Sequence, residues 1–501
     1  MKSIFKAVAV VTIFSIITRA LGFFFRIFLS RKLGAEGLGL FQMASAVLGI
    51  FMTLISSGLP LTTAKFVSRY EVNGELKKRN KVVASALVLA MLVAIISSLL
   101  LIVLKPFFGI ILTDNRAVQL LIILIPSLLF SAVYAIFRGA LWGQNDFFNC
   151  GLTELLEQII RFALTFFMLL KVTDTFVATK NSAIAFNLTC LLSALITMFI
   201  YFRRGRLNFR RGEYKQVFKS AAPITGVRLA NSLVQPLTSI IIPNMLIMIG
   251  YSGSEAVASY GVIMGMTFPM LFVPMAIVGS ISMVLIPSIS SMLARKEYDT
   301  IEQNITKSIQ VSVFISMLFI PLYLSVGDLI GIVLYNNAFS GVLLQLSAVC
   351  ILPITLCNLT GSVLNALNLE VKSFINYFIG SLVLFGTLIA LTPLVGINSV
   401  IIAFFLSMTI ITLLNLRMIK KKVPNFSFNL LSLLRYSFVV TISSLTGHFV
   451  SNIMLHILNN FFSACVGGGI AILITLILCK TFNLYNISEL FALIRNKKKK
   501  T

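Results

Sequence analysis

Two arginines, Arg19 and Arg26, stand seven residues apart in an otherwise apolar stretch of the sequence. In an α-helix, seven residues make almost two turns, so both guanidinium groups lie on one face, about 10 Å apart along the axis. A cation at the depth of a bilayer costs about 2.5–3.5 kcal/mol on insertion scales. We therefore expect the two arginines to face a wet cavity, where planar guanidinium groups are suited to binding phosphate oxygens.

Further polar side chains fall within other apolar stretches. Arg161 follows Glu157 by four residues, which is the spacing of an ion pair on one helix face. Such a pair can also be purely structural, and Arg228 can instead extend to the cytoplasmic interface. The side chains that we predict to bind substrate are Arg19, Arg26, Gln42, Glu157, Arg161, Arg228, Asn231 and Gln235.

The composition shows which elements must position these residues. The chain has 501 residues, of which 58% are hydrophobic and 11% charged, and its mean hydropathy is +0.98. These values lie far outside the range of soluble domains. Apolar stretches of about 20 residues recur along the whole chain and predict an all-α polytopic membrane protein with about 14 transmembrane helices. No cleavage site follows the first stretch, so we expect it to remain as a span.

The charge distribution predicts the orientation in the membrane. The formal net charge is +25, which could indicate nucleic-acid binding. Most lysines and arginines, however, lie in the segments that are inside if the N-terminus is cytoplasmic. This is the positive-inside pattern of a protein with both termini in the cytoplasm, here of a bacterial cytoplasmic membrane. We therefore expect no nucleic-acid partner, and we expect the basic C-terminal tail to lie on anionic lipid.

Short motifs recur along the chain and predict an internal repeat. The stretch GAEGLGLFQMA from Gly34 resembles GSEAVASYGVI from Gly253, with Glu36 and Glu255 at matching positions. LWGQND, after the fourth span, resembles LNALNLE, after the tenth, at nearly the same offset. Repeats with an even number of spans are related by an axis along the membrane normal. The expected parts are lobes of six helices at 1–205 and 206–425, a helix pair at 426–482 and a basic tail at 483–501, with Tyr201–Lys215 as the hinge.

Catalytic and metal-binding patterns are missing from the sequence. The chain has no GxxxxGK[ST] phosphate loop and no CxxC pair. Its two histidines, His448 and His456, are eight residues apart, which favours packing or interfacial roles over a shared metal. We predict a carrier and not an enzyme, without a cofactor; coupling to Na⁺, H⁺ or the membrane potential stays open.

Three stretches resemble one branch of a known superfamily. They are SIITRALGFFFRIFLSRKLGAEGLGLFQ (Ser15–Gln42), SSGLPLTTAKFVSRY (Ser56–Tyr70) and VPMAIVGSISMVLIPSISSMLARKE (Val273–Glu297). The chain is similar to the stage V sporulation protein B branch of polysaccharide exporters, in the multidrug/oligosaccharidyl-lipid/polysaccharide exporter superfamily. The resemblance implies two six-helix lobes in a V around a central cavity. It also implies movement of an undecaprenyl-pyrophosphate-linked saccharide to the outer leaflet by alternating access, with cell-wall synthesis enzymes as candidate partners.

The resemblance extends to the related lipid II flippases only in part. Their first span carries an arginine ladder resembling Arg19 and Arg26, but the cavity cations of their second and eighth spans are here about Thr53 and Pro269. The expected cargo is a peptidoglycan precursor for the spore cortex. The alternatives are a teichoic-acid or capsular precursor, or cation-coupled export of drugs. Drug export needs carboxylates deep in the membrane, and only Glu157 lies deep.

Overall fold

The computed structural model describes residues 2–203, 205–209, 212–424, 426, 432–482 and 484, which form helices and no strands. Ten helices of this part are long and apolar enough to cross a membrane, or eleven if the pair α5 and α6, bent by 42°, counts as one span. The prediction of an all-α polytopic membrane protein is confirmed, and the number fourteen stays a prediction. The chain divides into two compact units, Met1–Gly261 and Val262–Thr501.

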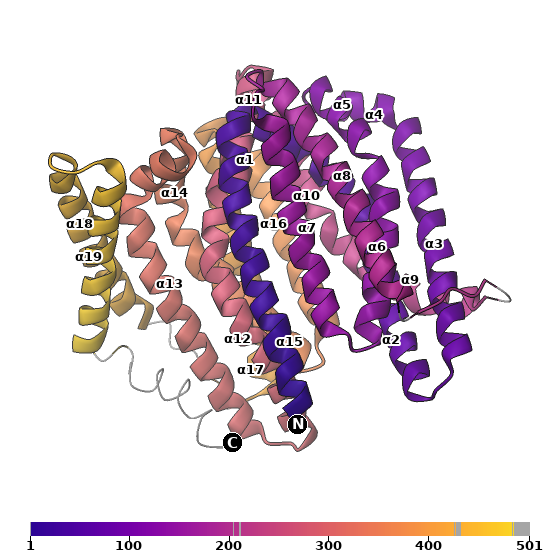
Figure 1. Ribbon diagram of the computed structural model, residues 1–501. Coiled ribbons are helices and arrows are strands. Elements are labelled where there is room, and N and C mark those ends of the chain that lie inside the picture. The colour runs from indigo at the N-terminus through magenta and orange to yellow at the C-terminus, as the bar shows by residue number, and fades with distance from the viewer. Residues whose placement is uncertain are drawn as a thin grey trace. The chain divides into compact units, whose positions relative to one another are not determined.

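Unit 1 contains the helices labelled α1 to α11 in Figure 1. The predicted lobe boundary after residue 205 stays a prediction; by their packing, the three helices that follow it belong to unit 1. The bounds are α1 (Lys2–Ser56), α2 (Gly58–Val72), α3 (Leu76–Val103), α4 (Lys105–Ile111), α5 (Asn115–Leu124), α6 (Pro126–Gly143), α7 (Phe147–Leu169), α8 (Thr175–Phe202), α9 (Tyr214–Ser232), α10 (Val234–Met248) and α11 (Gly253–Gly261).

A kink at Gly34 divides the long helix α1 into two halves. Gly34 has φ 65° and ψ −174°, a backbone conformation that glycine adopts without a steric penalty. The first half carries both Arg19 and Arg26, and the second half begins at Ala35. The kink therefore limits the arginine-bearing element to the segment before Gly34.

The first half of α1 packs against α7, and the two helices run side by side in Figure 1. The ring centroid of Phe14 lies 5.6 Å from that of Phe148. Further along, Phe25 and Phe28 lie 6.1 and 5.4 Å from Phe162. Residue numbers on both helices rise together along the contact, so the two helices run in parallel. The first and fifth predicted spans cross the membrane in the same direction, so helices formed by them are expected to pack in parallel.

The second half of α1 packs closely against α11. A Cβ atom on Gly39 would lie 2.1 Å from the carbonyl oxygen of Val257, and one on Gly261 would lie 2.1 Å from the carbonyl oxygen of Ala35. Only glycine allows two helix backbones to approach this closely. The two motifs that the sequence repeats are therefore in direct contact with each other.

The linker after α8 is attached to α3 inside unit 1. The backbone N–H of Asn208 donates to the carbonyl oxygen of Asn80 at 3.4 Å. The backbone N–H of Glu213 donates to the hydroxyl of Ser85 at 2.8 Å. The predicted hinge segment Tyr201–Lys215 is thus hydrogen-bonded to a neighbouring helix, and its role as a hinge stays a prediction.

Unit 2 contains the remaining described helices around an apolar core. This core includes Ile305 of α13, Leu359 of α15 and Ile419 of α17, which are almost inaccessible to solvent. The bounds are the π-helix η1 (Val262–Thr267), α12 (Phe268–Ala294), α13 (Tyr298–Tyr335), α14 (Ala338–Ser347), the 3₁₀-helix η2 (Ala348–Cys350), α15 (Ile351–Ala366), α16 (Glu370–Val395), α17 (Asn398–Lys422), α18 (Ser432–Leu455) and α19 (Asn460–Thr481).

A second kink, at Val326 of α13, is supported by a histidine of α18. Val326 has φ −132° and ψ 17°, outside the helical range. Nδ1 of His448 lies 3.0 Å from the carbonyl oxygen of Ser325, which only accepts hydrogen bonds, so Nδ1 carries the proton. In the neutral ring Nε2 then accepts from the side-chain amide of Asn452 at 3.2 Å. His448 therefore satisfies a carbonyl at the kink.

Candidate anion-binding face of the first helix

The first half of α1 exposes two different faces. Its exposed apolar side chains share one face, which suits contact with lipid: Ile13, Ile16, Ile17 and Phe24. Arg19 and Arg26 are also exposed, but at 100° per residue they lie about 130° around the helix axis from that stripe. Both arginines therefore lie apart from the exposed apolar stripe, and their contact with water stays a prediction. No acidic residue occurs between residues 13 and 33.

Two polar side chains near the arginines form hydrogen bonds within the first half of α1, and a third lies beyond the kink. The hydroxyl of Thr18 donates to the carbonyl oxygen of Phe14, and that of Ser30 donates to Ile27, each at 2.8 Å. Such bonds within the same helix satisfy the hydroxyls locally. Gln42 lies beyond the Gly34 kink and is half-buried. These three side chains do not extend the arginine face within the first half of α1.

An amide from α7, which the sequence does not mark, lies beside this face. A Cβ atom on Gly22 would lie 4.0 Å from Oε1 of Gln158. Gly22 stands between Arg19 and Arg26 in the sequence, and Gln158 is half-buried. Seven-residue spacing from Gly151 and four-residue spacing to Phe162 place Gln158 on the α1-facing side of α7. This spacing identifies Gln158 as facing α1 only when it is already known that α7 packs against α1.

The predicted ion pair of α7 is present. A guanidinium nitrogen of Arg161 contacts a carboxylate oxygen of Glu157, with side chains 21% and 18% exposed, and the guanidinium lies 5.3 Å from the ring centroid of Phe186. One turn earlier, Arg138 of α6 pairs with Glu154 at 2.6 Å. Both carboxylates of α7 therefore face an arginine, so this cluster carries no net charge.

The remaining residues predicted to bind substrate, Arg228, Asn231 and Gln235, belong to two helices. Arg228 lies in α9 and Gln235 in α10, and the helix is interrupted between them at Leu233. Both side chains are exposed. The side chain of Asn231 lies outside the described residues. That these residues lie near Arg19 and Arg26 stays a prediction.

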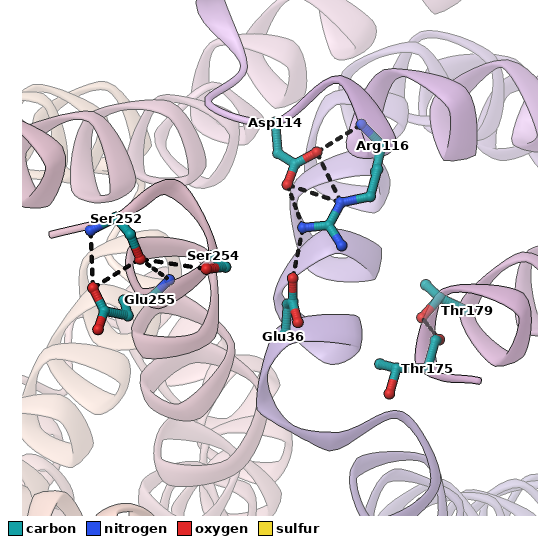
Figure 2. Close-up of polar contacts among 8 residues, drawn as sticks. All are labelled: Glu36, Asp114, Arg116, Thr175, Thr179, Ser252, Ser254 and Glu255. Carbon is teal, nitrogen blue, oxygen red and sulfur yellow. Dashed lines mark hydrogen bonds and ion pairs between the residues drawn. The ribbon is translucent and has the colours of Figure 1, made fainter. Parts of the chain in front are cut away.

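The two glutamates of the repeated motifs make different interactions, as Figure 2 shows. The carboxylate of Glu36 lies 2.6 Å from Arg116, which also pairs with Asp114 at 2.7 Å. Glu255 instead accepts hydrogen bonds from the backbone N–H and the hydroxyl of Ser252, at 2.9 and 2.8 Å. Only Glu36 links distant segments, because Arg116 belongs to α5.

The restart of α1 after its kink is also held by α8. A Cβ atom on Gly37 would lie 2.6 Å from the hydroxyl oxygen of Thr179 and 2.9 Å from the methyl carbon of Thr175 (Figure 2 shows both threonines). Together with the ion pair of Glu36, this close contact fixes the direction in which the second half of α1 leaves Gly34.

Among the described residues, no group of three or more His, Cys, Asp or Glu side chains could hold a metal ion.

Comparisons with known proteins agree with this architecture. The family described as polysaccharide biosynthesis protein matches residues 4–293, more than half of the chain. Stage V sporulation protein B of Bacillus subtilis (strain 168) is 25% identical over 424 residues, which cover 81% of this chain and 82% of that protein. The lipid II flippase MurJ of the same organism is 22% identical over 461 residues, covering 84% and 83%.

A solved structure has the same fold. The structure described as lipid II flippase MurJ in an inward closed conformation matches with a TM-score of 0.71 and 17% identity, covering 94% of this chain and 98% of that one. The predicted resemblance to the stage V sporulation protein B branch is confirmed by the family match and by these relatives. The chain belongs to the polysaccharide biosynthesis protein family.

Proposed function

We propose that this protein moves a lipid-linked saccharide with a diphosphate group from the inner to the outer leaflet of a bacterial cytoplasmic membrane. In this proposal Arg19 and Arg26 bind the diphosphate, both termini are cytoplasmic, and the saccharide is a peptidoglycan precursor for the spore cortex. The names of two relatives, a sporulation protein and a lipid II flippase, support this choice of cargo.

The arginine face of α1 is the observation that carries the proposal. It presents two exposed guanidinium groups on a helix segment without acidic residues, away from the exposed apolar stripe. Guanidinium groups bind phosphate oxygens through two parallel hydrogen bonds, and neutralising a diphosphate lowers the cost of holding it at membrane depth. A polyanionic headgroup therefore fits this face better than a neutral or cationic molecule does.

The acidic residues of α7 argue against export of cationic drugs. Such a cargo, like a coupling cation, needs a carboxylate that is available inside the membrane. Glu154 and Glu157 each pair with an arginine, Arg138 and Arg161. A cation would have to displace a guanidinium group to bind either one.

Reconstituted protein provides the test. Purified wild-type protein in liposomes should move a fluorescent undecaprenyl-diphosphate-linked saccharide between leaflets, and Arg19→Ala combined with Arg26→Ala should abolish the movement. Lys32→Ala is the matched control, because Lys32 is an exposed cation of the same helix half, close to the Gly34 kink. Equal rates for the wild type and the double variant, at equal protein level, would refute the proposal.

A further inference from the structure

Gln158 of α7 is held beside the arginine face by a fixed helix contact. The contact of Phe14 with Phe148 lies before it along α1 and α7, and the contacts of Phe25 and Phe28 with Phe162 lie after it. Aromatic contacts on both sides prevent α7 from sliding along α1. The position of Gln158 opposite Gly22 is therefore set by packing of the two helices.

Gly22 places the amide between the two arginines. At 1.5 Å per residue, Gly22 lies about 4.5 Å along the axis from Arg19 and about 6 Å from Arg26. The amide oxygen of Gln158 lies 4.0 Å from the position of a Cβ atom on Gly22, which is ordinary van der Waals contact. Because Gly22 has no side chain, space remains on the arginine face at this level.

The chemistry of the amide fits the same ligand as the arginines. A glutamine side chain offers two N–H donors without adding charge, and a phosphate oxygen is a strong acceptor. We propose that Gln158 is a third ligand of the diphosphate, donating a side-chain N–H to a phosphate oxygen between Arg19 and Arg26. This inference rests on the proposed function and adds a residue from a second helix to its site.

A comparison with the amides of unit 2 shows that the amide of Gln158 is left available to a ligand. Asn376 donates to Asn415 at 2.9 Å, and Asn415 donates to Thr360 at 3.1 Å, in a network whose members are at most 3% exposed. By contrast, the amide of Gln158 makes no hydrogen bond within the described part of the chain. The Gln158 amide is not among the buried polar atoms that lack a partner, so it is accessible and its N–H groups are available to a bound phosphate.

Shape-preserving substitutions of Gln158 separate ligand binding from helix packing. Gln158→Met keeps the length of the side chain but removes its donors, and Gln158→Glu replaces them with a negative charge. A hydrogen bond to a charged group contributes about 1.5–3 kcal/mol, so we expect Gln158→Met to weaken binding of inorganic pyrophosphate about tenfold or more. Gln158→Glu should weaken it further. Gln119→Met, at an exposed position of α5, should bind like the wild type.

Gly22 gives an independent pair of variants that leaves Gln158 unchanged. Gly22→Ala adds a Cβ atom at ordinary contact distance and should bind pyrophosphate within a fewfold of the wild type. Gly22→Leu fills the space between the arginines and should abolish binding. Binding is measured by calorimetry on the full-length protein in phosphatidylcholine nanodiscs, with thermal unfolding as the control for folding.

The outcomes distinguish the inference from the proposed function. If the wild type neither binds pyrophosphate nor moves the lipid-linked saccharide, the proposed function fails. If it does both, and Gln158→Met and Gly22→Leu bind like the wild type, the role of Gln158 is refuted and the proposed function stands. If phosphatidylglycerol in the nanodiscs displaces pyrophosphate, the site belongs to a phospholipid headgroup, and the assignment to the cargo is overturned.

Discussion

Arg19 and Arg26 combine charge with a planar group of donors, and substitutions can separate the two properties. Lysine keeps the charge but cannot form two parallel hydrogen bonds with a phosphate, and alanine loses both. We expect Arg19→Lys to retain more transport than Arg19→Ala, and the same order at Arg26, in the liposome assay. Protein level should be unchanged, because removing a cation makes membrane insertion easier.

The reverse order, or equal loss for lysine and alanine, would contradict recognition of phosphate by guanidinium geometry. The control is Arg203, an exposed arginine at the end of α8, for which lysine and alanine should both leave transport unchanged.

Glu36 and Glu75 allow a comparison between a linking ion pair and a local one. Glu36 pairs with Arg116 at 2.6 Å across two helices, and both side chains are 35% exposed. Glu75 pairs with Lys78 at 2.9 Å within one turn, with side chains 38% and 54% exposed. We expect Glu36→Gln to lower the stability of the protein by about 1 kcal/mol and Glu75→Gln to change it by much less.

Thermal unfolding of both variants in detergent checks this expectation. A larger effect at Glu75 than at Glu36 would show that the link between α1 and α5 does not contribute to stability.

Two glycines of one helix half test the contact between α1 and α11. A Cβ atom on Gly39 would lie 2.1 Å from a carbonyl oxygen of α11, whereas nothing lies within 4 Å of one on Gly49. We expect Gly39→Ala to destabilise unit 1 by about 1–3 kcal/mol through overpacking. Gly49→Ala should be neutral, or stabilising by up to about 1 kcal/mol, because alanine is the better helix former.

The measurement is the unfolding temperature in detergent, together with protein level in the membrane. Equal behaviour of the two alanine variants would mean that the helices can separate without loss of stability.

Features of a single helix could be predicted from the sequence, but contacts between helices could not. The pairing of Glu157 with Arg161 follows from a four-residue spacing, and apolar length predicts the helices themselves. The position of Gln158 opposite Gly22 depends on which helix packs against α1 and in which register. The sequence contains the aromatic residues of that contact but does not pair them.

Breaks within helices were the other limit. Gly34 kinks α1, but a glycine in an apolar helix need not change its direction, and Gly49 does not. Arg228 and Gln235 fall on one face of an ideal helix, but the interruption at Leu233 places them in α9 and α10. The prolines Pro223 and Pro236 show that backbone bonds are missing nearby, but not where the helix ends.

For the whole molecule, alternating access requires the predicted lobes, 1–205 and 206–425, to move against each other. The contact between α1 and α11 joins them, since Gly39 belongs to the first and Val257 to the second. We expect a cross-link between Val257→Cys and Met43→Cys, one turn from Gly39, to stop transport in a background without native cysteines. Reduction of the cross-link should restore it.

A matched cross-link inside one predicted lobe is the control. Phe14→Cys with Phe148→Cys joins α1 to α7, whose rings are in contact, and should leave transport active. Full transport by the verified cross-link between α1 and α11 would exclude a rocking motion that opens this contact.

The distance between Gly22 and Gln158 along the chain has a consequence for biosynthesis. About 140 residues separate them, and at about 5–20 residues per second a ribosome needs roughly 7–30 s to make the intervening chain. During that time the newly made first helix already carries Arg19 and Arg26, but α7 does not yet exist. The nascent helix must therefore be accommodated by the insertion machinery or by lipid headgroups, and the site becomes complete only when translation has passed α7.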